Sequence, residues 1–140
     1  MDVYIAREAE KEIAALGLFG EGKGSLGLLL GHTRGKRFFV EGLFVAPGRD
    51  WPSLDGLYAL DRLFEGRVIG FFAFRPGGPA ARALLAPQAV GKAYLEISRA
   101  RRTGTFKLAA SAVDFDGRFK FVPLPLRREP AAKPASRKRP

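Results

Sequence analysis

The stretch SLGLLLG at residues 25–31 decides the fold class. It is short and almost wholly apolar, which is the pattern of a central strand buried on both faces. The run FFVEGLFV at residues 38–45 is rich in aromatic and β-branched side chains and predicts a second strand. A polar segment from His32 to Arg37, with Gly35 inside it, separates the two runs. We therefore expect a turn there, and a second strand antiparallel to the first.

Helix and strand patterns alternate on both sides of this pair. Residues 3–16 have the apolar spacing of an amphipathic helix, and a glycine-rich link follows at 17–24. Ser53 is placed to cap a helix that runs to about Glu65 and ends at Gly66. The other expected elements are strands at 67–74, 92–99, 105–115 and 119–124, a loop with a short helix at 80–90, and a hairpin turn at Asp116-Gly117. This order predicts an α/β or α+β domain with a mixed central sheet flanked by helices.

Composition restricts the chemistry that this chain can perform. The chain has 140 residues, enough for one domain, with no cysteine and a single histidine, His32. Thiolate metal sites, cysteine nucleophiles and any site that needs two imidazoles are therefore excluded. No apolar run approaches the ~18 residues of a membrane span, and the first residues, MDVY, do not resemble a secretory signal. We expect a soluble, cytoplasmic domain with no membrane partner.

The charge is placed unevenly along the chain. The net charge is +10, yet residues 1–65 carry eight Lys/Arg against ten Asp/Glu, and residues 66–140 carry sixteen against four. This asymmetry favours polyanionic or acidic partners, although solubility alone also accounts for it. From Arg127 onward the sequence has six cations, three prolines and no large apolar residue. We expect a domain at 1–126 and a flexible basic tail at 127–140.

Three short motifs occur in order along the chain. GLLLG at 27–31 follows one expected helix, and VIGFF at 68–72 follows another. RPGGPAARA at 75–83 comes next, with the Gly-Pro-Ala of residues 78–80 in it. In order and spacing these motifs resemble the JAB/MPN family, also called Mov34/PAD-1 or JAMM, and the resemblance covers residues 1–126. It implies the cytidine-deaminase-like architecture of that family, a mixed sheet flanked by helices.

The same resemblance implies that the family's metal site is lost. In active members two histidines and an aspartate bind zinc, and a glutamate acts as general base on the zinc-bound water. On this sequence the glutamate falls on Gly24, and the histidines fall on Ala73 and Arg75. The family's serine and aspartate fall on Ala83 and Ala86. The resemblance therefore implies a catalytically inactive domain with no zinc and no other cofactor.

Inactive domains of this family act as dimerisation and docking platforms in large complexes. The resemblance thus implies a protein partner or a second copy of the chain, with the apolar stripes of the helices at 3–16 and 54–64 as candidate surfaces. A second hypothesis belongs to another class. The chain would then be a nucleic-acid-associated accessory protein that binds through its basic C-terminal half and tail.

Aromatic residues in the middle of the chain are candidates for a protein interface. Alternate side chains of a strand face opposite sides, so Phe71, Phe72 and Phe74 cannot all lie in one core. At least one of them is expected against a covering helix or a partner. Trp51 lies in a loop between two prolines, and it is either an interface anchor or packed back onto its own domain. His32 is interpreted as an exposed turn residue.

Basic residues are candidates for anion or nucleic-acid contacts. Arg75, with the backbone N–H groups of Gly77 and Gly78 nearby, either binds an anion or is an exposed loop arginine or a structural salt-bridge residue. The other candidates lie toward the C-terminus: Arg99, Arg101, Arg102, Arg127, Arg128, Arg137, Lys138 and Arg139. Contacts of this kind bind phosphates without sequence specificity and weaken strongly with salt. Solvated charge is the alternative interpretation.

Overall fold

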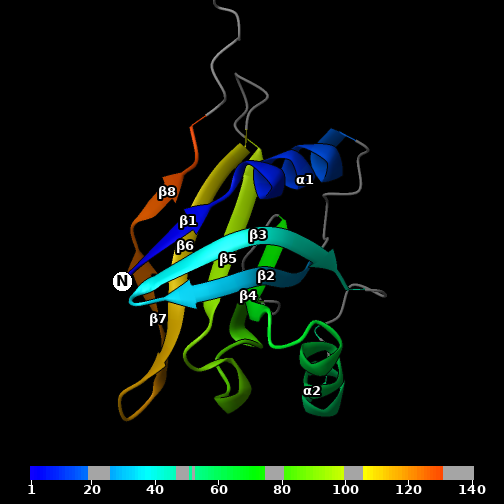
Figure 1. The fold of residues 1–140 in the computed structure, drawn as a ribbon. Helices are drawn as coiled ribbons and strands as arrows, with labels where there is room; N and C mark the ends of the chain where they lie inside the picture. Colours follow the sequence, from blue (N-terminus) through cyan, green and yellow to red (C-terminus); the bar gives the residue numbers. More distant parts are fainter. Residues whose placement is uncertain (19–25, 47–50, 52, 75–80, 100–105, 131–140) are drawn as a thin grey trace, which may run out of the picture.

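The computed structural model describes residues 1–18, 26–46, 51, 53–74, 81–99 and 106–130. Within these ranges the chain forms two α-helices, one 3₁₀ helix and eight strands (Figure 1). In chain order they are β1 (Asp2–Ile5), α1 (Arg7–Leu18), β2 (Leu26–Arg34), β3 (Arg37–Val45), α2 (Leu54–Leu63), β4 (Val68–Phe74), η2 (Pro87–Ala89), β5 (Ala93–Arg99), β6 (Phe106–Phe115), β7 (Phe119–Leu124) and β8 (Leu126–Arg128). Neither α-helix among these residues is long and apolar enough to cross a membrane.

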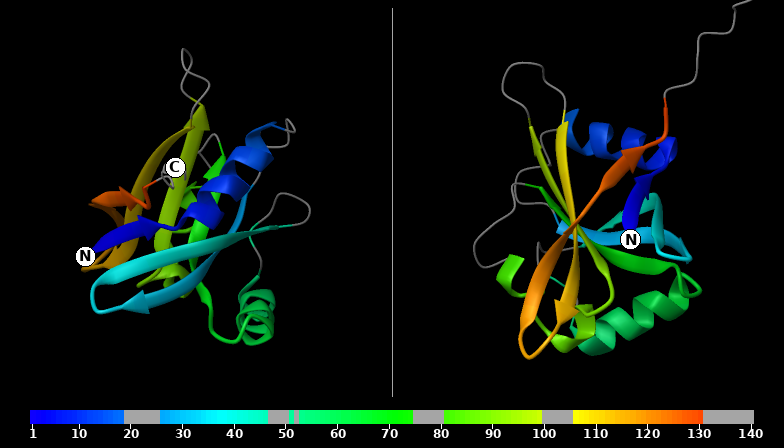
Figure 2. Two further views of the ribbon diagram at one scale, coloured as in Figure 1. Left: turned by 45° about the horizontal axis from the view of Figure 1, so that its top comes forward. Right: turned by 90° about the vertical axis from the view of Figure 1, so that its left-hand side faces the viewer.

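All eight strands belong to one mixed sheet in the order β7-β6-β5-β4-β2-β3-β1-β8. The pairs β4–β5, β1–β3 and β1–β8 are parallel, and the other pairs are antiparallel. The two edge strands, β7 and β8, follow one another in the chain with only Pro125 between them. The last strands therefore bring the two edges together, and the sheet nearly closes on itself (Figure 2). The expectation of an α+β domain with a mixed sheet is confirmed.

The inner side of the sheet is the side that carries α1. Ala9 and Ile13 of α1 are buried against it, and Leu16 packs at the margin. The helix thus buries one apolar stripe at i, i+4 spacing, as its sequence predicts. This inner core contains Val3, Ile5, Ala9, Ile13, Leu29, Phe38, Val40, Ile69, Phe72, Phe74, Ala93, Leu95, Ile97 and Ala110.

The outer side of the sheet carries α2 and η2. Ser53 caps α2 because its hydroxyl accepts a hydrogen bond from the Gly56 backbone N–H at 3.1 Å, as expected. Leu57 is buried against the sheet, and the Phe64 ring meets the Phe44 ring edge-on at 5.2 Å. The outer core contains Leu26, Leu28, Leu30, Ala46, Leu57, Val68, Phe71, Ala73, Leu84, Ala89, Tyr94 and Val113.

The glycines that bound the leucine run of β2 are required by close backbone approach. A Cβ on Gly27 would collide with the backbone carbonyl of Phe44, and a Cβ on Gly31 would collide with that of Phe39. Both carbonyls belong to β3, which pairs with β2 along its whole length. The GLLLG motif therefore combines three core side chains with two positions at which only hydrogen fits.

The start of the chain differs from the expected helix at 3–16. Residues 2–5 form β1, which lies between β3 and β8, and the helix begins only at Arg7. Val3 and Ile5 are buried while Asp2 and Tyr4 alternate with them, so this segment follows a period of two. The two apolar residues also fit a helical stripe, and that ambiguity produced the wrong prediction.

Ordered structure extends further along the chain than expected at two places. β2 continues through His32 to Arg34, so His32 lies on a strand and the turn is confined to Gly35 and Lys36. The expected tail at 127–140 begins too early, because β8 reaches Arg128 and the Glu129 N–H donates to the Ile5 carbonyl. Residues 131–140 lie outside the described residues. In the segment 80–90, where a short helix is expected, Ala81 and Arg82 are helical and η2 is a 3₁₀ helix of three residues.

Candidate functional site

The positions that the resemblance assigns to zinc ligands do not gather in one place: Ala73 lies near the end of β4, whereas Ala83 and Ala86 precede η2, which lies by the start of β4. Ala73 is buried on β4 and pairs with Leu26 on one side and Glu96 on the other. Ala83 is exposed and Ala86 is half-buried in the segment before η2. Gly24 and Arg75 lie outside the described residues. The three positions that are described carry methyl side chains, which offer no donor atom to a metal.

A carboxylate that the sequence analysis overlooked lies beside Ala73. Tyr94 and Glu96 are on the outer side of β5, whereas the apolar residues that alternate with them face the inner core. Burial raises the pKa of the Tyr94 hydroxyl above its ordinary value, and the Glu96 carboxylate raises it further. The alternation of polar and apolar residues at 93–98 was the signal that could have found them. Among the described residues, no group of three or more His, Cys, Asp or Glu side chains could hold a metal ion.

The phenylalanines proposed for an interface are buried instead. Phe71 is 2% exposed in the outer core, and its ring meets the Trp51 ring edge-on at 5.7 Å. Phe72 and Phe74 are 0% and 5% exposed in the inner core, on the opposite face of β4. The alternation argument was correct, but two cores of the same domain accommodate the side chains. Trp51 is half-buried and packs back onto its own domain through Phe71, so the three phenylalanines form no exposed patch.

Two candidate arginines of the C-terminal half, Arg127 and Arg128, lie close to carboxylates of the fold. Arg127 Nε lies 3.3 Å from Asp2 Oδ2, and Arg128 Nε lies 3.2 Å from Glu10 Oε1. Arg128 also donates to the Phe106 carbonyl at 3.1 Å. These contacts fasten β8 to β1, α1 and β6. Other predicted contacts lie outside the described residues: Arg75, Arg101, Arg102, Arg137, Lys138, Arg139 and the side chain of Arg99.

A cavity of about 210 Å³ lies between α2, the start of β4 and η2. Its lining combines apolar side chains with two residues of opposite charge, Asp61 and Lys92. Lys92 Nζ donates to the Val68 carbonyl at 3.2 Å, which fixes its position. The lining residues are Leu57, Tyr58, Asp61, Val68, Pro87, Gln88 and Lys92. They come from three separate segments, so no local motif predicted the cavity.

Large apolar side chains are exposed on the same elements. Tyr58 is 62% exposed and Leu63 is 71% exposed on α2, and Val90, which follows η2, is 39% exposed. We call this surface the α2 face. The sequence analysis proposed the apolar stripe of this helix as a candidate surface, and in the structure that stripe is divided. Leu57 faces the sheet, whereas Leu63 faces solvent.

The fold defines the class of the protein as an α+β domain built on one nearly closed mixed sheet. No protein-family model matches the chain, and no curated protein matches it. Among solved structures, the solution structure of protein DSY2949 from Desulfitobacterium hafniense is similar, with a TM-score of 0.59. The similarity covers 91% of this chain and 94% of that one at 17% sequence identity. At this identity the similarity concerns the fold alone.

Proposed function

We propose that this chain is a non-catalytic protein-binding domain of JAB/MPN type, which docks a second protein chain on its α2 face. The observation that carries the proposal is the exposure of Tyr58 and Leu63 beside the cavity. Large aromatic and aliphatic side chains next to a pocket are typical of the centre of an interface. The order of motifs along the sequence supports the family assignment.

The absence of catalysis is proposed from the residues at the family's ligand positions. Zinc hydrolysis needs imidazole and carboxylate ligands and a general base. Ala73, Ala83 and Ala86 provide none of these atoms. Glu96 is a single carboxylate beside Ala73, and one carboxylate does not complete a tetrahedral site. We therefore expect the purified chain to bind no stoichiometric zinc and to cleave neither peptide nor isopeptide bonds.

Metal analysis of the purified protein tests this half of the proposal. One zinc ion per chain, together with a hydrolytic activity that a chelator removes, would contradict it. Zinc without hydrolysis would also contradict the assignment of Ala73, Ala83 and Ala86 as a lost metal site.

The α2 face is tested by charge substitutions at its exposed apolar residues. Tyr58→Asp and Leu63→Asp should each remove partner binding without unfolding the chain, because both side chains are exposed. Phe115→Asp is the matched control, since Phe115 is a 52% exposed aromatic residue on another part of the fold. Far-UV circular dichroism checks the fold of each variant.

Two measurements define the partner. Sedimentation velocity of the purified chain reports a second copy, and affinity purification with nuclease treatment reports another protein. A dimer, or a defined set of partners, that is lost in Leu63→Asp and kept in Phe115→Asp supports the proposal. Association that is equal in all three variants, or no association at all, contradicts it.

A further inference from the structure

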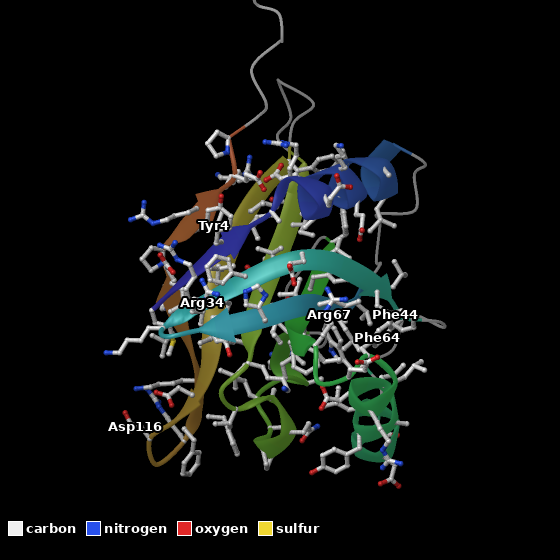
Figure 3. The ribbon with its side chains drawn as sticks, in the orientation of Figure 1. Tyr4, Arg34, Phe44, Phe64, Arg67 and Asp116 are labelled. Carbon is white, nitrogen blue, oxygen red and sulfur yellow. The ribbon has the colours of Figure 1, made fainter. Side chains whose placement is uncertain are left out.

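Part of the outer side of the sheet is not covered by α2 and carries a row of aromatic rings. His32 of β2 pairs with Phe39 of β3, which pairs in turn with Tyr4 of β1. The His32 and Phe39 rings are stacked with centroids 4.9 Å apart, and the Phe39 and Tyr4 rings are tilted with centroids 5.6 Å apart. We call these three residues the aromatic row. Figure 3 shows Tyr4 and Arg34 at one end of the β2–β3 hairpin, away from Phe44, Phe64 and α2.

Arginines surround this row on three strands and a loop. Arg37 lies above two of the rings, with its guanidinium carbon 5.7 Å from the Tyr4 centroid and 5.8 Å from the Phe39 centroid. Two hydrogen bonds of 2.8 Å from Arg37 to the Asp2 carboxylate hold it there. Arg34 is the register partner of Arg37, and Arg127 is the register partner of Tyr4.

The charge of this surface is positive. The side chain of Arg34 is exposed and makes no hydrogen bond or ion pair within the described part of the chain. Arg67 and Arg127 have side chains that are 50% and 66% exposed. Two carboxylates oppose the four arginines: Asp2, which is bound to Arg37 and Arg127, and Glu41, which contacts His32 Nδ1 at 3.2 Å and Arg67 at 3.4 Å.

We infer that this surface binds single-stranded nucleic acid, with bases stacked at the ends of the aromatic row and phosphates bound by the arginines. The His32 ring covers a face of the Phe39 ring, and the Tyr4 ring contacts Phe39 at an interplanar angle of 50°. The ring surface open to a base is therefore at the ends, on His32, whose side chain is 49% exposed, and on Tyr4. Aromatic rings interleaved with arginines on a sheet are the combination that single strands require.

This surface favours single-stranded nucleic acid over a nucleic-acid duplex and over a polyanion that has no bases. In a duplex the bases are stacked on one another, so their faces cannot reach His32 or Tyr4. A polyanion without bases uses the arginines but gains nothing from the rings. This surface lies away from the α2 face, so the inference adds to the proposed protein docking and does not depend on it.

Fluorescence anisotropy with a labelled oligothymidine of fifteen nucleotides tests the inference on the full chain. We expect a dissociation constant of about 1–100 µM at physiological salt, the range of non-specific binding. His32→Ala should weaken binding about fivefold, at the low end of the loss of one stacked base. Arg34→Glu should weaken it about tenfold, and Arg34→Gln should lower the salt slope by about 0.7.

The control comes from an aromatic pair on the β6–β7 hairpin. The Phe115 and Phe119 rings lie 4.8 Å apart, and Arg118 is exposed between them in sequence. Acidic residues Asp114 and Asp116 balance the cations there, so a polyanion should not bind. Phe115→Ala and Arg118→Glu should therefore leave the affinity unchanged. Thermal melts confirm that each variant is folded.

Three outcomes would overturn the inference. One is no detectable binding at low salt. Another is an equal loss for His32→Ala with oligothymidine and with heparin, which has no bases to stack. The third is binding that is unchanged in His32→Ala and Arg34→Glu but lost when Arg137, Lys138 and Arg139 are all replaced by glutamine. Loss in the two surface variants, with heparin binding kept in His32→Ala, supports it.

Discussion

The two halves of the β2–β3 hairpin carry different kinds of side chain on the outer side of the sheet. Near α2 the hairpin presents Leu28 and Phe44, which the helix covers. Toward its turn the same strands present the aromatic row and arginines, and α2 does not reach them (Figure 3). The change falls at a register shift between Leu30 and Gly31, where Glu41 has no partner residue. A β-bulge at such a boundary redirects side chains and is frequent beside functional sites.

One strand pair therefore packs against a helix along one half and exposes a polar and aromatic surface along the other, and only the side chains differ. The backbone pairing continues across the shift, from Gly27 to Arg34. Apolar side chains on one half attract the helix because their burial is favourable. Charged and aromatic side chains on the other half stay in solvent, where they are free to bind a ligand. Substitutions in each half should therefore have different consequences.

The largest expected effect comes from the outer core beside the covered half, at Phe71 of β4, which pairs with Leu28 of that half. Phe71→Ala removes a ring that is 2% exposed and contacts Trp51, and it should lower the free energy of unfolding by about 3–5 kcal/mol. Phe39→Ala, in the open half, removes a partly exposed ring and should cost less than half as much. Urea denaturation measures both variants. Equal costs would mean that the open half is as much a part of the core as the covered half.

The second-largest expected loss of stability comes from a substitution at the boundary between the two halves of the hairpin. Gly31→Ala places a methyl group against the Phe39 carbonyl, so β2 or β3 must move, and the expected cost is about 1–3 kcal/mol. Gly42→Ala is the control on the partner strand, because its Cβ would lie 3.5 Å from the Glu12 carboxylate, an ordinary contact. The control should change stability by less than about 0.5 kcal/mol. Similar losses in both variants would contradict the close-approach argument for the GLLLG motif.

Sequence patterns predicted most of the elements whose partners are close in the chain. The β2–β3 pair, the Ser53 cap of α2 and the β6–β7 hairpin at Gly117 depend on local signals, and all three are confirmed. β1 was missed because its neighbours, β3 and β8, come from distant parts of the chain. Its two apolar residues cannot distinguish a helix from a strand without those neighbours.

The candidate surfaces were harder to predict than the fold. His32 was assigned to a turn because it is polar, and only the register of three strands places it beside Phe39 and Tyr4. Arg127 was assigned to a tail, yet it lies on β8 and pairs with Tyr4 of β1. Phe71 was proposed as an interface residue although it is buried in the structure. The exposure of a strand residue depends on which other parts of the chain cover the strand. No local pattern carries that information.

The smallest expected effect is a pH dependence at the edge of the open half. The side chain of Asp2 accepts hydrogen bonds from Arg37, which holds the pKa of that carboxyl below its ordinary value. A carboxyl whose pKa is lower in the folded state stabilises the fold at neutral pH. This contribution falls as the pH drops from about 4, the unfolded value, through the lower folded value. Asp2→Asn should therefore be less stable than the natural chain at pH 7, and the difference should shrink in acid.

Urea denaturation of both proteins between pH 3 and pH 7 measures this difference. Glu8→Gln is the control, because the Glu8 side chain is 73% exposed and its one ion pair among the described residues is with Lys11 in the same helix. Its stability difference from the natural chain should be close to zero throughout. A constant difference for Asp2→Asn across the range would mean that Arg37 is held above Tyr4 and Phe39 by packing and not by the Asp2 carboxylate. In the Asp2→Asn variant the arginine would then keep its position on the aromatic row. The net charge of the open half would be more positive by one unit in that variant than in the natural chain.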